Sequence, residues 1–220
     1  MSVLAPRRLL LLFVGLVIMS FGIALSVRSD LGTTTISSVP YVTSLITPVT
    51  LGTATILLNA GFLGVQILLL RRRFPLVQLL QLPVVMVFGL LNDAALWATS
   101  WITYSAYWQQ WLLTLSAIVV LSVGIVFQIA AQSVMLSGEA VVLTIASELS
   151  RAFGQRRIFV FGYVKVVFDI VLVLSALALA LLFAGRVVGV GEGTVAAALF
   201  IGVVVKRLQP VLGARLARFR

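Results

Sequence analysis

The 220-residue sequence contains no cysteine and no histidine. Without cysteine the chain forms no disulfide and has no thiol chemistry. Without histidine it lacks the commonest acid–base side chain and metal ligand, which excludes a Ser-His-Asp triad. No other metal-ligand cluster or activated nucleophile is visible in the sequence. We therefore expect no metal, no cofactor and no enzymatic activity.

Charge is also scarce, since Asp, Glu, Lys and Arg together make up only 10% of the residues. A soluble domain carries about a quarter of such residues to cover its surface. Here 61% of the residues are hydrophobic and the mean hydropathy is +1.19. Because the polar coat of a soluble domain is missing, the sequence predicts an integral membrane protein with the lipid bilayer as its surroundings.

The formal net charge of +10 could indicate a nucleic-acid partner, but the basic residues gather at the ends of apolar stretches. The clusters are Arg7 and Arg8, Arg71 to Arg73, Arg151 with Arg156 and Arg157, Lys206 with Arg207, and Arg215 with Arg218 and Arg220. This pattern is typical of cytoplasmic anchors that fix membrane topology. Phosphate tracking would need a continuous basic stripe instead. We therefore expect no nucleic-acid partner.

About 20 apolar residues are needed to cross a bilayer. The candidate spans are residues 9–27, 51–70, 76–98, 111–132, 158–183 and 194–208. Two shorter stretches, 33–47 and 139–150, remain, and the first would be only about 22 Å long as a helix. If neither crosses, every basic cluster falls on one side. The sequence thus predicts six spans in the cell (inner) membrane, with both termini cytoplasmic.

The order of elements suggests an internal repeat, because span, break, short helix, span and span occur twice, with the breaks at residues 28–35 and 132–139. Ser20 to Ile23 also weakly matches Ser122 to Ile125. Three spans per repeat would give the repeats opposite orientations, an architecture that recurs in transporters. We predict an all-α polytopic helix bundle with repeats at 1–105 and 106–208. The short helices are either re-entrant or interfacial.

Residues 209–220 form a basic tail. Its apolar positions Leu212, Leu216 and Phe219 fall on one helical face, beside Arg215, Arg218 and Arg220. This spacing is typical of an amphipathic helix on the inner leaflet. The alternative is a frayed polar terminus.

Ionisable residues inside a span are costly and indicate function. Lys165 and Asp169 lie four residues apart in the fifth span and can pair. Asp169 would lie about 16 Å from the start of the span, close to the midplane. The pair is either a substrate or proton site or an ion pair that only holds helices together.

Further polar residues lie near the breaks. Thr33 and Thr34 lie at the N-terminus of the first short helix and Glu139 opens the second, where free N–H groups and the helix dipole favour an anion. Glu139 either caps that helix or binds a cationic group. Arg28 and Asp30 either pair at the headgroup level, or Arg28 holds a carboxylate or sulfonate. The candidate substrate-binding residues are Asn59, Lys165, Asp169, Glu139, Thr33, Thr34, Gln128, Arg28, Asp30 and Asp93.

Several short motifs resemble the YitT/YczE family of bacterial integral membrane proteins, in particular its YczE-like branch. The motifs are Ser29 to Gly32, Leu51-Gly52 with Asn59, Gln78 to Gln81, Phe88-Gly89 with Asp93, Gly138-Glu139, Lys165 with Asp169, and Gly191 to Thr194 followed by Gly202. The resemblance covers nearly the whole chain. It implies a compact multi-spanning bundle of unassigned function, often suspected of transport, and it supplies no site residues.

The sequence therefore favours a secondary, gradient-driven transporter for a small polar or charged organic solute, or an ion, bound near the midplane. Nothing in it resembles an ATP-hydrolysing module. One alternative is a substrate-capturing membrane subunit of a larger transport complex. Another is an accessory membrane protein that regulates a partner enzyme. Homo-oligomerisation and a partner subunit both stay open.

Overall fold

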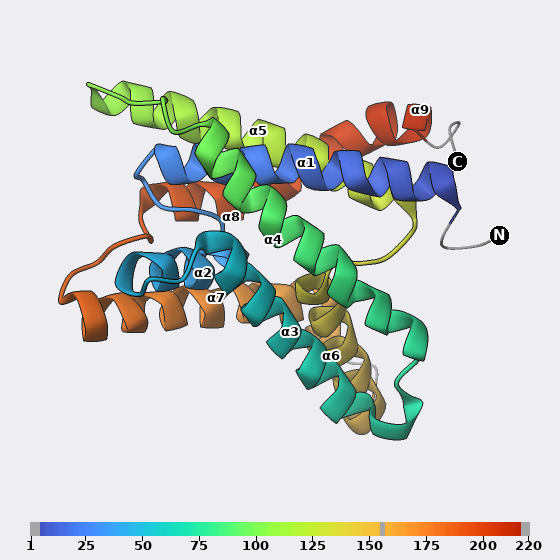
Figure 1. Ribbon diagram of the computed structural model, residues 1–220. Helices are drawn as coiled ribbons and strands as arrows, with labels where there is room; N and C mark the ends of the chain where they lie inside the picture. Colours follow the sequence, from blue (N-terminus) through green and yellow to red (C-terminus); the bar gives the residue numbers. More distant parts are fainter. Residues whose placement is uncertain (1–4, 155–156, 217–220) are drawn as a thin grey trace.

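The computed structural model describes residues 5–154 and 157–216, and within these ranges every regular element is helical (Figure 1). Six helices are long and apolar enough to cross a membrane, which confirms the predicted all-α polytopic bundle. They are α1 (Pro6–Arg28), α3 (Leu51–Leu70), α4 (Gln81–Ala98), α5 (Tyr107–Ala131), α7 (Phe161–Leu179) and α8 (Glu192–Leu208). The two shorter helices are α2 (Thr35–Ile46) and α6 (Ser137–Phe153).

Tighter or wider helical turns extend several of these elements. Two turns, η1 (Arg71–Arg73) and η2 (Leu76–Leu80), connect α3 to α4, and η3 (Arg157–Phe159) precedes α7. η4 (Ala180–Ala184) prolongs α7. η5 (Gln209–Gly213) and α9 (Ala214–Leu216) prolong α8.

Both predicted breaks begin where the backbone leaves the helical region. After α1, Asp30 and Gly32 have φ values of 57° and 94°, and after α5, Gln132 has a φ of 44°. Such left-handed residues end a helix. The chain re-enters helical structure at α2 with Thr34 as N-cap, whose hydroxyl accepts a hydrogen bond from the Ser37 N–H at 3.4 Å. The breaks therefore separate each short helix from the preceding span.

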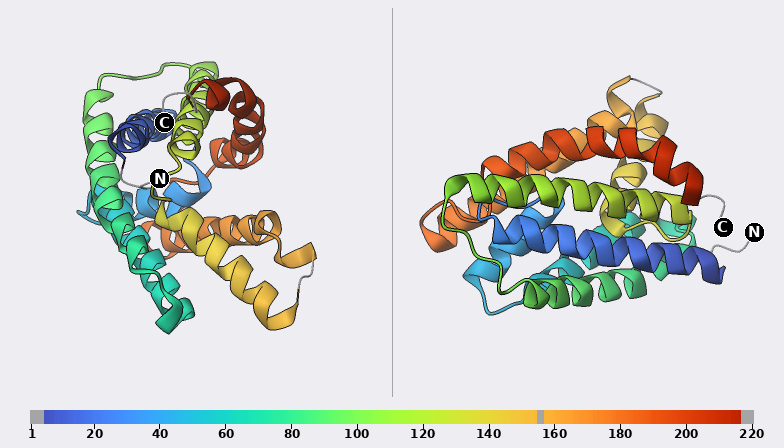
Figure 2. Two further views of the ribbon diagram at one scale, coloured as in Figure 1. Left: turned by 90° about the vertical axis from the view of Figure 1, so that its right-hand side faces the viewer. Right: turned by 90° about the horizontal axis from the view of Figure 1, so that it is seen from above.

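The antiparallel helices α1 and α5 lie side by side at the centre of the bundle (Figure 2). α4 packs against α1, and α8 packs against α5. The short helices lie at opposite ends of the molecule, α2 at the left and α6 at the right of Figure 1. Each packs against two long helices, α3 and α7.

The described part of the predicted tail, residues 209–216, extends the sixth span and does not form a separate surface helix. The helix continues from α8 through η5 and α9, and Leu216 is buried in the same core cluster as Val126 of α5. Leu212 packs against this cluster too. The described part of the tail is thus a continuation of the sixth span whose apolar side packs on α5. Arg156, Arg218, Phe219 and Arg220 lie outside the described residues.

Candidate functional site

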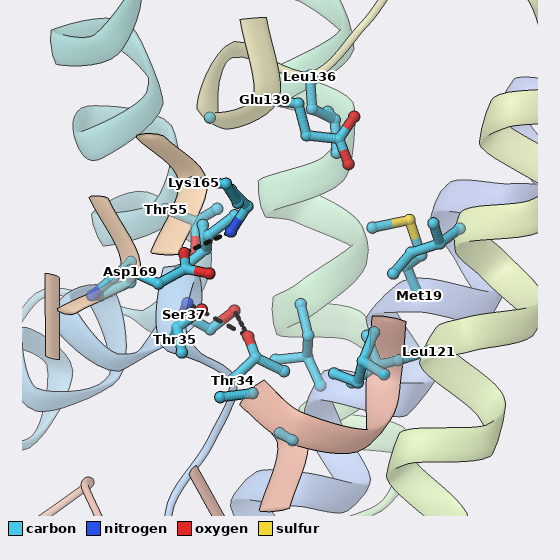
Figure 3. Close-up of a pocket in the computed structure, with 18 of the residues that line it drawn as sticks. Met19, Thr34, Thr35, Ser37, Thr55, Leu121, Leu136, Glu139, Lys165 and Asp169 are labelled. Atoms are coloured by element: carbon cyan, nitrogen blue, oxygen red, sulfur yellow. Dashed lines mark hydrogen bonds and ion pairs between the residues drawn. The ribbon is translucent and has the colours of Figure 1, made fainter. Parts of the chain in front are cut away.

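A cavity of about 350 Å³ lies inside the bundle, and all eight of the helices α1 to α8 contribute to its wall. Its position brings the two short helices together, since α2 and α6 both begin at the cavity (Figure 3). Thr34, Thr35 and Ser37 line it from α2, and Gly138 and Glu139 line it from α6. The first turn of a helix carries unpaired N–H groups and a partial positive charge. Two such helix ends therefore face one space.

Charged side chains reach this cavity from α7 and α6. Lys165 and Asp169 form an ion pair one helical turn apart, and about three quarters of each side chain is buried. Glu139 accepts a hydrogen bond from the Gln128 Nε2 at 3.2 Å, and Lys165 is close enough to act electrostatically on its carboxyl group. Figure 3 shows Glu139 across the cavity from Asp169. The site therefore offers both signs of charge to a ligand.

Neutral polar groups reach the cavity from α3. Asn59 and Thr55 are buried one turn apart, and the Asn59 Nδ2 donates to the Thr55 carbonyl at 2.9 Å. That bond uses one of the amide's two N–H groups. Asn59 was among the predicted site residues, whereas Thr55 and Ser37 were not. Spacing could have found Thr55, since it lies four residues before Asn59 on the same helical face.

The rest of the wall is apolar, and none of these apolar residues was among the predicted site residues. Met19 and Ile23 of α1, Phe88 of α4, and Leu121 and Ile125 of α5 line the cavity. In a chain that is apolar throughout, no sequence signal separates a cavity-lining leucine from one that faces another helix. The cavity thus joins a polar region at α2, α3, α6 and α7 to an apolar region at α1, α4 and α5.

Two predicted site residues act behind the cavity wall. Gln128 does not line the cavity, but its hydrogen bond holds the Glu139 carboxylate. Thr33 is fully buried, and its hydroxyl bonds the Ser26 hydroxyl at 2.8 Å. This bond ties the first break to the end of α1.

Three predicted site residues lie outside the cavity. Asp93 accepts hydrogen bonds from the Gly52 N–H and the Thr50 hydroxyl, both at 2.7 Å, and so joins α4 to the start of α3. Arg28 donates to the Leu96 carbonyl at 2.7 Å near the end of α4. The third, Asp30, accepts a hydrogen bond from an aromatic residue rather than forming an ion pair with Arg28.

The partner of Asp30 is Tyr104, which lies in the loop after α4 and donates its hydroxyl at 3.1 Å. Desolvation and the adjacent Asp30 carboxylate raise the pKa of this phenol above its ordinary value. Among the described residues, the ion pairs join Lys165 to Asp169 and Glu148 to Arg73 and Arg151. Arg28 and Asp30 are not among them.

Gln66, which shares a face of α3 with Asn59, has a structural role. It is fully buried and exchanges two hydrogen bonds of 3.2 Å with Gln81 of α4. Its Nε2 also lies 3.4 Å from the Ser137 carbonyl at the start of α6. The amide pair thus joins three helices behind the cavity. Within the described ranges no group of three or more acidic residues could hold a metal ion.

Residues 6–210 match the model of a protein family described as a family of unknown function, DUF6198. The match covers most of the chain, which therefore belongs to this family. Neither a curated protein nor a solved structure matches the chain. The matching family description does not mention YitT or YczE proteins, so that resemblance stays a prediction.

Proposed function

We propose that this member of the DUF6198 family is a secondary transporter for a small polar or charged organic solute. The observation that carries the proposal is the central cavity, where the first turns of α2 and α6 meet Lys165, Asp169 and Glu139. Ionisable side chains inside a membrane bundle are costly, and they mark substrate and ion pathways when they face an internal cavity. Half-helix ends at such a cavity are typical of secondary transporters.

We also propose that the two halves of the chain are inverted repeats with the site between them. Residues of the cavity wall support this, because ten of the 22 form five pairs whose members are 102 positions apart. The pairs are Met19 with Leu121, Ile23 with Ile125, Thr34 with Leu136, Ile36 with Gly138, and Ser37 with Glu139. Equivalent positions of two repeats would thus line one cavity from both sides.

The packing contacts between helices are consistent with the same correspondence between the two halves. If α1 to α4 correspond to α5 to α8, the central α1–α5 contact maps onto itself. The contact of α1 with α4 then corresponds to that of α5 with α8, and the contact of α2 with α7 corresponds to that of α6 with α3. This mutual packing of short helices on the other half supports a two-fold relation.

Within that relation the two halves contribute different chemistry. Thr55 and Asn59 of α3 and Lys165 and Asp169 of α7 are each four residues apart and line the cavity. The α3 pair offers neutral hydrogen bonding and the α7 pair offers charge. A solute with a charged group and hydrogen-bonding groups fits both sides. Asp169 and Glu139 are the carboxylates that would couple its movement to a proton or cation gradient.

We propose that both termini are cytoplasmic in a bacterial inner membrane. In Figure 1 the start of α1 and the end of α9 lie at the right, together with the connection from α3 to α4 that carries Arg71 to Arg73. The loop after α4 lies at the left, and Trp97 in the last turn of α4 and Trp101 in this loop are both exposed. Basic residues on one side and aromatic residues on the other favour this orientation.

The test is a solute screen on the purified full chain, read as the rise in its thermal unfolding midpoint. A ligand that binds only the folded state stabilises it by RT ln(1 + L/Kd), where L is the free ligand concentration. We expect a solute whose stabilising effect is lost in Asp169→Asn and Asn59→Ala, while both variants stay folded. Glu148→Gln, which removes a carboxylate near the cytoplasmic end, should bind as the wild type does. A solute whose affinity ignores Asn59, Glu139, Lys165 and Asp169 would contradict the proposed site.

A further inference from the structure

The cavity reaches the outer surface of the bundle at one place. Among the described residues that line it, three are exposed, Val166 of α7 and Ala198 and Gly202 of α8. The lining residues from the other helices are buried or half-buried. A residue that is exposed and also lines the cavity marks an opening. The cavity therefore opens between α7 and α8.

The corresponding place in the first half is closed. There α3 and α4 pack closely, and a Cβ on Gly89 would lie 2.7 Å from the Gly52 carbonyl oxygen. Asp93 fastens the same crossing through the Gly52 N–H. In the described structure α7 and α8 share no comparable interface. A Cβ on Gly162 or Gly202 would meet nothing within 4 Å.

The surface around this opening is suited to lipid and not to water. Both helices are hydrophobic enough to be candidate spans. Val167 of α7 and Leu199 of α8, which adjoin the exposed lining residues, are themselves more than 60% exposed. Exposed apolar surface on a membrane span faces hydrocarbon. The opening therefore leads sideways into the bilayer.

The interior of the cavity matches a molecule that is itself divided into polar and apolar parts. Lys165 and the first turns of α2 and α6 favour a negative group, while Asp169 and Glu139 favour a positive one. Met19, Phe88 and Leu121 form an apolar wall. A wholly polar solute would leave this wall without a partner. An amphiphile would fill both regions and extend its chain through the opening.

We infer that the opening between α7 and α8 is a lateral portal and that the substrate class is an amphiphile with a zwitterionic head. This rests on the proposed transport function and narrows its substrate. The head would bind at Lys165, Asp169 and Glu139, and the chain would remain in contact with lipid at Gly202. A molecule already dissolved in the membrane reaches this site without crossing an aqueous vestibule.

The test compares two probes that share a head, lysophosphatidylethanolamine and its chain-free counterpart glycerophosphoethanolamine. Binding to the full chain is measured in nanodiscs of phosphatidylglycerol, whose head is anionic and not zwitterionic, for the wild type, Gly202→Phe and Gly61→Phe. A phenylalanine at Gly202 would block the portal. Gly61 on α3 is also free of neighbours but does not line the cavity, so it is the matched control.

We expect the lysophospholipid to bind the wild type and Gly61→Phe alike, with at least about tenfold weaker binding to Gly202→Phe. The chain-free head should bind more weakly than the lysophospholipid. Equal binding of the two probes with no effect of Gly202→Phe would overturn the portal but leave the proposed polar site intact. Binding of neither probe would overturn the zwitterionic amphiphile.

Two further outcomes distinguish a portal from a surface lipid site and from a subunit interface. Lysophospholipid binding that ignores Lys165→Met and Glu139→Gln would place the molecule outside the cavity, which would overturn the inference and weaken the proposed function as well. A dimer of the wild type that Gly202→Phe dissociates would show the gap to be an interface between two copies of the chain. That result would also overturn the portal.

Discussion

Gly22 of α1 and Gly124 of α5 occupy equivalent places at the central helix crossing. A Cβ on Gly22 would lie 2.9 Å from the Leu121 backbone nitrogen, and a Cβ on Gly124 would lie 2.8 Å from the Met19 backbone nitrogen. Leu121 precedes Gly124 by three residues, and Met19 precedes Gly22 by three. Each glycine thus meets the residue one turn before the other glycine.

This relation predicts matched effects of two substitutions. Gly22→Ala and Gly124→Ala should each destabilise the protein by about 1–3 kcal/mol, because the added methyl group would collide with backbone that cannot move independently. The expected result is a similar fall in thermal unfolding midpoint for both variants in detergent. Gly61→Ala, where the methyl group meets nothing, should be neutral or stabilise by up to about 1 kcal/mol. Unequal effects at the two glycines would contradict an equivalent role in two repeats.

The Lys165–Asp169 pair admits a test that separates ligand binding from helix packing. Lys165→Met should destabilise the protein, because it leaves the Asp169 carboxylate without its ion-pair partner inside the bundle. The exchanged variant, Lys165→Asp with Asp169→Lys, restores opposite charges and should recover most of the lost unfolding midpoint. If the pair binds substrate, the exchange should not recover binding, since each charge then lies one turn away from its original place. Recovery of both properties would show a purely structural ion pair.

Composition and charge placement were sufficient to predict the six spans, because each is a long apolar run and each basic cluster lies at an end. The short helices were also predictable, because the nearly uncharged stretches 33–47 and 139–150 are too short to cross a bilayer. That Asn59, Glu139, Lys165 and Asp169 line one cavity could be expected only in general terms, because transporters built from inverted repeats tend to bind their substrate where the repeats meet. Which amides support the fold was not predictable, because Asn59 and Gln66 differ only in the helix that each faces.

Asn92 of α4 is a further polar residue whose role the sequence left open. It is 1% exposed, and within the described part of the chain neither its Nδ2 nor its Oδ1 has a hydrogen-bond partner. A buried amide without partners costs free energy. Asn92→Leu, which keeps a similar volume, should therefore leave stability unchanged or raise it by up to about 2 kcal/mol in thermal unfolding. A clear loss of stability would instead indicate that the Asn92 amide binds a buried water or a ligand.

The absence of cysteine makes the proposed orientation directly testable. Ser100→Cys lies in the exposed loop after α4, and Arg72→Cys lies in the exposed connection between α3 and α4. A membrane-impermeant maleimide should label the first variant in intact cells and the second only after the membrane is opened. The unsubstituted chain, which has no thiol, is the control for background. The reverse labelling pattern would place both termini outside.

The difference between the closed α3–α4 crossing and the open α7–α8 gap predicts that the helix bundle has a second arrangement. If the repeats exchange conformations during transport, Gly162 and Gly202 should approach each other much as Gly52 and Gly89 do. A disulfide requires Cα atoms within about 7 Å, and neither Gly162 nor Gly202 has a neighbour near its Cβ position. Gly162→Cys with Gly202→Cys should therefore cross-link under mild oxidation only when α7 and α8 close together.

We expect this cross-link to form slowly in membranes, to arrest substrate binding, and to be reversed by reduction. Gly61→Cys with Gly202→Cys is the matched control, since both positions are open but α3 and α8 have no extensive contact. Cross-linking of the control at the same rate would indicate random collision. If the Gly162–Gly202 pair never cross-links while substrate still binds and moves, then α7 and α8 stay apart throughout the cycle. Alternating access would then have to come from movement of α2 and α6. The first turns of these two helices also form part of the cavity wall, and each follows a break in the chain.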